Sequence, residues 1–192
     1  MSTSQPIKSR DELASLKNYY LTVRSNPRNY LLIITGINTA LRISDILSLR
    51  WQDFYDFSAN RLKGHLLLTE QKTGKETCIA VNESLRQALL SYLESIPRPQ
   101  PGDFIFYGKT PDAPLSRSQA FRIIKHAGSE LQLSRQISCH SLRKTFGYHA
   151  WAAGTSPTLL MVIYNHSSFS ITRRYLGIEQ DDKDRVFLDL NL

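Results

Sequence analysis

One segment near the N-terminus constrains the fold more than any other part of the chain. Residues 30–34 read Tyr-Leu-Leu-Ile-Ile, which is five apolar side chains in succession. Asn26 precedes Pro27 and is biased away from helical geometry, so a new helix is expected over about residues 28–38. A helix that is apolar on every face is stable only when other elements surround it. We therefore expect this helix to lie at the centre of the hydrophobic core.

The remaining periodicities predict further helices around this one and a single region of strands. Ser9 is an expected N-cap, because Asp11 and Glu12 follow it and apolar residues then recur at helical spacing. The predicted helices span about residues 10–23, 28–38, 44–49, 82–95, 116–131, 140–153, 157–164, 168–176 and 179–190. Residues 51–57, 62–69 and 76–81 predict strands, and residues 104–106 a further short one. The expected class is α+β, mostly α-helical with a small three-stranded antiparallel sheet.

Composition narrows the class of protein and of partner. The chain has 192 residues, 41% of them hydrophobic, which fits one domain with a sizeable core, and residues 1–9 are expected to be disordered. The formal net charge of +7 favours a polyanionic partner such as nucleic acid. Two cysteines form no disulfide framework. There is no signal peptide and no apolar run of about 18 residues, so we expect a cytoplasmic protein with no membrane partner.

A group of residues near the C-terminus points to phosphate chemistry. His140 and Arg143 lie three residues apart and can share one helix face, and a second histidine follows at His166. Tyr175 stands in an Arg-Arg-Tyr-Leu run. Several side chains that can donate hydrogen bonds to an anion, together with a phenol, indicate a tyrosine nucleophile that attacks phosphorus. A metal site is not expected, because the histidines lack the short spacing of zinc ligands and no cysteine pair accompanies them.

Five stretches of the chain follow one another in a diagnostic order. They are Thr39-Ala40-Leu41-Arg42-Ile43-Ser44-Asp45, Lys72-Thr73-Gly74-Lys75, His140-Ser141-Leu142-Arg143, Asn165-His166-Ser167-Ser168 and Arg174-Tyr175. This order and spacing resemble the catalytic domain of the tyrosine recombinases, also called the phage integrase family, over about residues 28–178. Each stretch alone is a weak signal, and the five together are specific.

The resemblance implies a role for each of six residues. Tyr175 would attack a DNA phosphodiester, form a 3′-phosphotyrosyl link and release a 5′-hydroxyl. A second strand's 5′-hydroxyl would then attack that link, so that no ATP, metal or cofactor is needed. Arg42 and Arg143 would bind the non-bridging oxygens, and Lys72 would protonate the leaving oxygen. His140 and His166 would hydrogen bond the phosphate or move protons.

The chemistry explains why these residue types are needed. Attack on a phosphodiester builds charge on the non-bridging oxygens, which preorganised donors stabilise. A guanidinium is planar, always charged and matches two phosphate oxygens at once. A free tyrosine has a pKa of about 10, so at neutral pH it needs a base or a positive field. We expect the two arginines and the two histidines to supply that field.

The expected partner is double-stranded DNA that carries recombination sites. Further DNA contacts are predicted for basic residues that flank the chemistry or lie on the 116–131 helix, namely Lys75, Arg117, Arg122, Lys125, Lys144, Arg173 and Arg174. On that helix Phe121, Ile124 and Ala127 are expected to face the core. The resemblance implies a homotetramer on DNA that is a monomer or weak oligomer when free, helped by accessory DNA-bending proteins. It also implies a bacterial, phage or mobile-element origin and association with the nucleoid.

The sequence also departs from the family pattern. Asn165 replaces a common glycine before the second histidine, and asparagine is the next-best residue for left-handed geometry. Ala40 replaces another glycine, with a smaller expected effect. Only about 40 residues precede Arg42, so no N-terminal core-binding domain is expected; the chain is either a lone catalytic domain or a piece of a longer protein. The apolar tail, residues 179–192, either folds onto its own core or is exchanged between protomers.

Three other functions compete with an active site-specific recombinase. A type IB topoisomerase-like enzyme would nick and reseal one strand by the same chemistry. A catalytically inactive DNA-binding regulator and an unrelated helical scaffold would need no chemistry at all. The compact arrangement of the five motifs favours the recombinase over the topoisomerase-like enzyme, and the complete set of six catalytic residues favours it over an inactive regulator.

Overall fold

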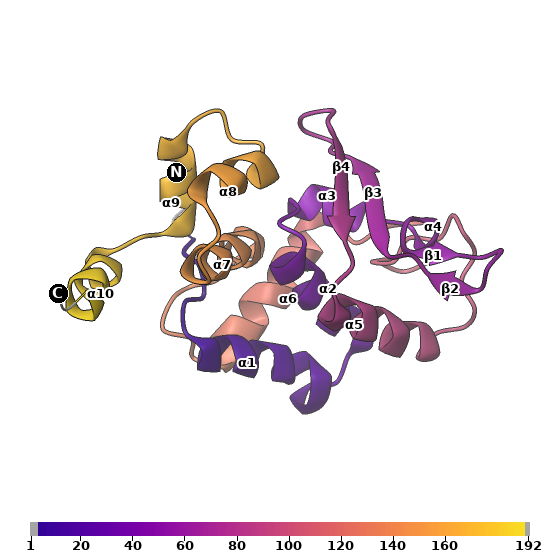
Figure 1. The fold of residues 1–192 in the computed structure, drawn as a ribbon. Helices are drawn as coiled ribbons and strands as arrows, with labels where there is room; N and C mark the ends of the chain where they lie inside the picture. The colour runs from indigo at the N-terminus through magenta and orange to yellow at the C-terminus, as the bar shows by residue number, and fades with distance from the viewer. Residues whose placement is uncertain (1–3, 191–192) are drawn as a thin grey trace.

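A computed structural model describes residues 4–190 of the chain, the Arg185 side chain excepted. Figure 1 shows a mostly helical molecule with two short antiparallel ladders at one end. In chain order the elements are α1 (Arg10–Asn18), the π-helix η1 (Tyr19–Val23), α2 (Pro27–Asn38), α3 (Ile43–Leu47), α4 (Trp51–Phe54), β1 (Tyr55–Asp56), β2 (Arg61–Leu62), β3 (His65–Thr69), β4 (Glu76–Ala80), α5 (Glu83–Glu94), α6 (Arg117–Glu130), α7 (Cys139–Ala152), α8 (Pro157–Tyr164), α9 (Phe169–Leu176) and α10 (Gln180–Asp189). None of the helices within residues 4–190 is long and apolar enough to cross a bilayer.

Helix α2 lies at the centre of the molecule, as its apolar sequence predicts. Residues 31–34 are fully buried, and α2 packs against both α5 and α7 (Figure 1). Gly36 permits the close approach of α7, because a Cβ at this position would lie 2.6 Å from Leu142 Cδ1. This approach brings the segment after α2, which carries Arg42, next to the helix that carries Arg143.

The start of α7 is set by a capping box. Ser138 Oγ accepts a hydrogen bond from the backbone N–H of His140 at 3.3 Å, and Ser141 Oγ accepts one from the N–H of Ser138 at 3.1 Å. Reciprocal caps of this kind satisfy orphan donors and fix the first helical residue. His140 is thereby placed in the first turn of α7, and Arg143 follows at the start of the second turn.

The predicted three-stranded sheet is wrong in its details, although the mainly helical α+β class is confirmed. The strands form two separate pairs, β1 with β2 and β3 with β4, and the second pair runs in register from His65↔Ala80 to Thr69↔Glu76. Residues 51–54 form helix α4, because the Asp53 carboxylate accepts the Arg50 N–H at 2.8 Å and caps a helical turn. Residues 104–106 make only an isolated bridge with Arg50 and no strand.

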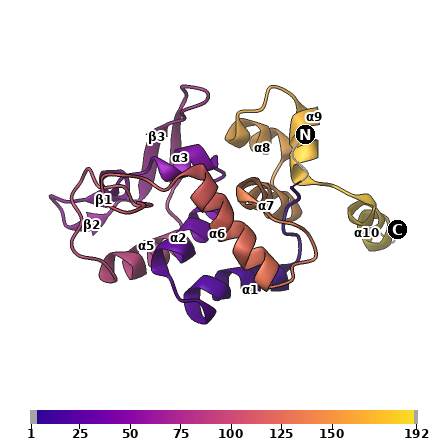
Figure 2. The same cartoon turned by 180° about the vertical axis from the view of Figure 1, so that it is seen from behind.

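Helix α6 crosses the face that Figure 2 presents, running from α3 toward α1. Its buried stripe consists of Ala120, Ile124 and Ala127, so the predicted positions of Ile124 and Ala127 are confirmed. Phe121 was expected to face the core and is instead 41% exposed. The stripe follows the i, i+4, i+7 spacing from residue 120, and this leaves residue 121 at its solvent edge.

The N-terminal segment is packed where disorder was expected. Ile7 is 3% exposed; its N–H donates to Thr145 Oγ1 at 2.9 Å, and its carbonyl lies 2.9 Å from His149 Nε2. The Ser4 carbonyl accepts a hydrogen bond from Lys144 Nζ at 2.6 Å. Polar side chains of α7 thus satisfy backbone groups of Ser4 and Ile7, and these tertiary contacts hold the N-terminal segment against α7. Residues 1–3 lie outside the described part.

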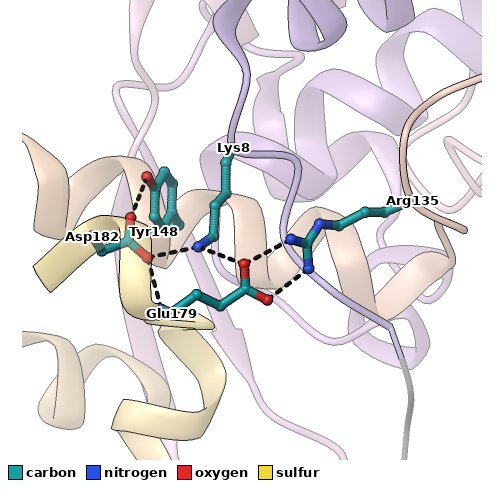
Figure 3. A network of polar contacts seen from close by, with 5 residues as sticks. All are labelled: Lys8, Arg135, Tyr148, Glu179 and Asp182. Carbon is teal, nitrogen blue, oxygen red and sulfur yellow. Dashed lines mark hydrogen bonds and ion pairs between the residues drawn. The ribbon is translucent and has the colours of Figure 1, made fainter. Parts of the chain in front are cut away.

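Within residues 4–190, a polar network holds the start of the C-terminal helix. Lys8 Nζ lies 2.6 Å from the Asp182 carboxylate and 3.3 Å from that of Glu179, and Arg135 forms two hydrogen bonds with Glu179 (Figure 3). Tyr148 donates to Asp182 at 3.0 Å. Beyond this network the tail projects from the body (Figure 1), and its apolar side chains are exposed: Val186, Phe187, Leu188 and Leu190.

Candidate active site

All six predicted catalytic residues line one open cleft of about 1450 Å³. They reach it from separate elements: the link between α2 and α3, the β3–β4 hairpin tip, helix α7, the loop after α8, and helix α9. In that order the residues are Arg42, Lys72, His140 with Arg143, His166 and Tyr175. The predicted constellation is therefore brought together from five parts of the chain that are far apart in sequence.

Arg143 is the most deeply buried charge of the cleft, with an exposed fraction of 2%. Its guanidinium donates to the carbonyl of Ala40 and, at 3.1 Å, to that of Tyr164. Tyr164 in turn donates its hydroxyl to the Arg143 carbonyl at 2.7 Å. Burial lowers the pKa of Arg143, but a guanidinium stays charged in proteins. The fixed positive charge therefore calls for an anion in the cleft.

Ala40, which holds Arg143, is itself in an unfavourable conformation. Its φ is +56°, in the left-handed region that costs an L-residue about 1–2 kcal/mol. A glycine would avoid this cost, so the presence of alanine where the family pattern has glycine costs more stability than expected. Strain of this kind persists where surrounding contacts over-determine the backbone, and here the contact is the hydrogen bond from the buried guanidinium.

Tyr175 places its hydroxyl among the basic groups of the cleft. The hydroxyl lies 3.3 Å from His140 Nδ1, and its ring packs edge-on against the rings of His140 and His166, with centroids 4.8 and 4.7 Å away. The Arg143 guanidinium carbon is 5.8 Å from the centre of the phenol ring and Lys144 Nζ is 5.7 Å from it. Tyr175 is therefore placed to lose its proton to a neighbouring base and to be attracted by fixed charge.

The hydroxyl groups of two other nearby tyrosines donate hydrogen bonds within the fold. Tyr164 is fully buried and its hydroxyl is bonded to the backbone of α7; burial raises its pKa above the ordinary value. Tyr148 donates its hydroxyl to Asp182 on the far side of α7. Within residues 4–190, Tyr175 is the tyrosine that lines the cleft.

Both histidines are neutral at pH 7. Burial, and then the charges of Lys144, Arg143 and Arg42, lower the pKa of His140 to about 4. Burial, and then the charges of the two arginines, lower the pKa of His166 to about 4 as well. The expected contribution of the histidines to the positive field is therefore wrong. A neutral His140 that carries its proton on Nε2 can instead accept the Tyr175 proton at Nδ1, and the field comes from the arginines and Lys144.

The segment before His166 has the geometry expected from its sequence. Asn165 ends α8 with φ +58° and ψ +42°, so it takes the left-handed conformation that suits glycine or asparagine at a helix end. His166 Nδ1 lies 2.9 Å from Thr172 Oγ1 on α9, which is fully buried. This contact ties the loop histidine to the helix of the candidate nucleophile.

The two lysines of the hairpin tip have different surroundings. Lys72 is exposed and lines the cleft. Lys75 donates from Nζ to the Asn165 side chain at 2.6 Å and is absent from the cleft lining. These positions favour Lys72 as the lysine that approaches a bound phosphodiester, as the resemblance implies.

The predicted DNA contacts are split between surface and interior. Arg117 and Lys125 are exposed on α6 and line the cleft, and Arg122 is exposed outside it. Arg173 and Arg174 are exposed on α9. Lys144 was predicted to contact DNA, but it is buried, and its ammonium donates to the Ser4 carbonyl instead.

Sequence reasoning missed one buried residue of this region, Glu70. Its carboxylate pairs with Arg42 at 2.6 Å and is 2% exposed. A lone acidic residue before a turn gives no signal in the sequence, because its pairing depends on the folded hairpin. Among the described residues no group of three or more histidine, cysteine, aspartate or glutamate side chains could hold a metal ion.

Comparison with known proteins agrees with this geometry. The profile of the Phage integrase family matches residues 9–181. The chain is 41% identical over 181 residues to the probable integrase/recombinase YoeC of Bacillus subtilis (strain 168), covering 94% of this chain and 93% of YoeC. It is 27% identical over 158 residues to a tyrosine recombinase of Pseudothermotoga lettingae, covering 82% of this chain and 52% of that protein.

Solved structures show the same fold. The crystal structure of XerA recombinase superimposes with a TM-score of 0.78 at 20% identity, covering 99% of this chain and 67% of that one. The Tn1549 transposon integrase in complex with circular intermediate DNA gives a TM-score of 0.70 at 20% identity, covering 98% of this chain and 66% of that one. Because the family profile matches residues 9–181 and a relative that is 41% identical covers 94% of the chain, the chain belongs to the phage integrase family, which includes the tyrosine recombinases.

Proposed function

We propose that this tyrosine-type site-specific recombinase cleaves and rejoins double-stranded DNA with Tyr175 as nucleophile. One observation carries the proposal: the Tyr175 hydroxyl lies 3.3 Å from His140 Nδ1 in the cleft that also holds Arg42 and Arg143. A nucleophile beside a base and two fixed guanidinium groups is the arrangement that attack on a phosphodiester requires.

The first step breaks one phosphodiester and forms another. The phenol proton passes to His140 Nδ1 while the phenol oxygen bonds to phosphorus. The two arginines donate to the non-bridging oxygens, where charge accumulates in the transition state. The bond to the 5′ oxygen breaks, and Lys72 donates a proton to that oxygen, leaving a 3′-phosphotyrosyl link and a free 5′-hydroxyl.

The second step reverses these transfers with a different strand. A 5′-hydroxyl from a partner strand loses its proton to the now neutral Lys72 and attacks the phosphotyrosine. The Tyr175 oxygen leaves and recovers its proton from His140. One ester replaces another at each step, so the exchange conserves the bond energy and consumes no ATP.

The proposed partner is double-stranded DNA, held by the exposed basic residues around the cleft. Arg117 and Lys125 on α6 and Arg173 and Arg174 on α9 are candidates for phosphate contacts, which release counterions and make binding salt-dependent. An enzyme of this kind would work at the nucleoid of a bacterium or on a phage or mobile element.

The exposed tail favours strand exchange in an assembly over the nicking and resealing of a topoisomerase. Three large apolar side chains of the last helix, and that of Leu190 directly after it, are more than half exposed, from Val186 at 55% to Leu188 at 80%. Contiguous exposed apolar surface of this kind marks an interaction site. We propose that α10 packs on a neighbouring protomer in a tetramer on DNA.

Covalent capture tests the proposal and identifies the target site in the same experiment. The protein is incubated with a library of random-sequence duplexes that carry a nick, so that cleavage traps the enzyme on DNA. Adducts that survive detergent are recovered and sequenced. We expect enrichment of one site by the wild-type chain and no adduct with Tyr175→Phe. The absence of any adduct between the wild-type chain and the whole library would favour an inactive regulator.

A further inference from the structure

Glu70 is a buried acid for which the proposed mechanism has no use. It follows strand β3 and lies beneath the hairpin tip, where its side chain is 2% exposed while that of its partner Arg42 is 20% exposed. Buried carboxylates are rare unless they are paired, because losing water disfavours their charge. Its position beside the phosphate-binding groups therefore needs a physical reason.

One carboxylate oxygen of Glu70 joins two parts of the cleft. Oε2 accepts from Arg42 Nη1 at 2.6 Å and from Thr73 Oγ1 at 2.8 Å. Arg42 stands at the N-cap of α3, whereas Thr73 follows Lys72 in the hairpin tip. The same atom thus contacts one of the two phosphate-binding arginines and the neighbour of the proposed proton donor.

The backbone of Glu70 closes the same tip. Its carbonyl accepts from the Gly74 N–H at 2.8 Å, and its N–H donates to the Lys75 carbonyl at 2.9 Å. A second buried carboxylate, Asp45 on α3, accepts the Gln71 N–H at 3.0 Å. The two neighbours of Lys72 are therefore both hydrogen bonded to buried acids: Gln71 to Asp45 on α3, and Thr73 to Glu70, which also contacts Arg42.

The charge of Glu70 survives its burial. Burial raises the pKa of this carboxyl, but hydrogen bonds from Thr73 and Arg42 and the charges of Arg42 and Arg143 outweigh it, so its pKa lies below the usual value. A guanidinium has five N–H donors in a rigid plane, and the contact with Glu70 occupies one edge only. The remaining donors of Arg42 stay available for a phosphate.

We infer that Glu70 is a positioning residue that holds the Arg42 guanidinium and the Lys72-bearing tip in one fixed relation. Both groups then address the same phosphodiester, one at its non-bridging oxygens and the other at its leaving oxygen. This inference rests on the proposed function. Small displacements of catalytic groups, on the order of 1 Å, can cost about 100-fold in rate.

A sulfur-substituted substrate separates this role from a purely structural one. When the 5′ bridging oxygen at the captured cleavage site is replaced by sulfur, the leaving thiolate needs no proton, so defects in proton donation are rescued and other defects are not. We expect Glu70→Ala to cleave the oxygen substrate about 100-fold more slowly at unchanged DNA affinity. On the sulfur substrate it should recover at least about tenfold, with the remaining deficit due to Arg42.

Further variants define each arm of the contact. Thr73→Val loses only the tip contact, so its defect should be fully rescued by sulfur, as should that of Lys72→Ala. Glu70→Gln keeps the side-chain shape and one acceptor oxygen. If Glu70→Ala does not fold, Glu70→Gln is used in its place. Glu76→Ala removes an exposed glutamate from the same hairpin and serves as the matched control with wild-type rates.

Hydrogen exchange gives a readout that does not depend on cleavage. Amides of residues 71–75 should exchange faster in Glu70→Ala than in wild type, and at the wild-type rate in Glu76→Ala. The inference is overturned if Glu70→Ala cleaves within about threefold of wild type, or if sulfur rescues Lys72→Ala and not Glu70→Ala. These results would leave a Tyr175-dependent adduct of the wild-type chain intact, whereas its absence would refute the proposed function itself.

Discussion

The two cleft histidines should make the free protein acid-sensitive in a defined range of pH. The pKa of His140 is about 4 in the folded chain, against an ordinary value of 6.5, because the fold buries it beside positive charges. Between these two values the unfolded chain binds the proton and the folded chain does not. Stability is therefore fully present above about pH 6.5 and falls as the pH drops toward 4.

The size of this effect follows from the shift. Each pH unit below about 6.5 costs up to about 1.4 kcal/mol per histidine, so each histidine lowers the free energy of unfolding by at most about 2 kcal/mol at about pH 5. The cleft is open to water, so we expect screening to reduce this to about 1 kcal/mol. Glu70 and Asp182 have lowered pKa values and stay charged over this range, so they do not add to the slope.

Urea unfolding followed by circular dichroism measures the effect. The free energy of unfolding of wild type should fall by about 1 kcal/mol more than that of His140→Gln between about pH 7 and pH 5. Replacing the exposed His65 with glutamine should leave the wild-type slope unchanged. If wild type and His140→Gln lose the same stability over this range, the burial argument for a neutral His140 is refuted.

Three other predictions concern the arginine, the loop and the tail. Arg143→Lys should lower the cleavage rate by at least about 100-fold in a folded protein. The reason is that one ammonium cannot both donate to the Ala40 and Tyr164 carbonyls and bind two phosphate oxygens. Single-turnover cleavage measures this rate, and a loss below about tenfold contradicts the prediction. Asn165→Ala should lower the free energy of unfolding by about 1 kcal/mol, because alanine is strained in the left-handed conformation, whereas Asn165→Gly should not lower it. Urea unfolding measures both variants, and equal stability of the two would refute the role of Asn165 as a left-handed helix cap. Deletion of residues 180–192 should abolish synapsis of two DNA sites while sparing binding to one, measured by gel shift, and normal recombination by the truncated chain would contradict the exchanged tail.

Features that rest on local chemistry could be predicted from the sequence. Helix α8 begins at Pro157 and ends at Tyr164 as expected, because proline fixes its own φ at the helix start and Asn165 adopts the left-handed conformation that caps the helix end. The order and spacing of the motifs predicted the six candidate catalytic residues, and the cleft brings them together from five parts of the chain, with His140 and Arg143 both on α7.

Features that depend on distant packing could not be predicted. Lys144 looks like a surface lysine in sequence, but it is buried and its ammonium donates to the carbonyl of Ser4, 140 positions away. The loss of charge at His140 likewise comes from burial and from charges on other elements. Predicting strands across residues 51–54 failed because the cap by Asp53 outweighed β propensity.

The most direct test of the proposed chemistry locates the DNA link on the protein. Wild-type protein trapped on nicked DNA is digested with nuclease and trypsin, and the nucleotide-bearing peptide is identified by mass spectrometry. We predict the link on the peptide that starts at Tyr175, directly after Arg174, and the loss of every adduct in Tyr175→Phe. A link on another tyrosine, or an adduct that survives this substitution, would contradict Tyr175 as the nucleophile.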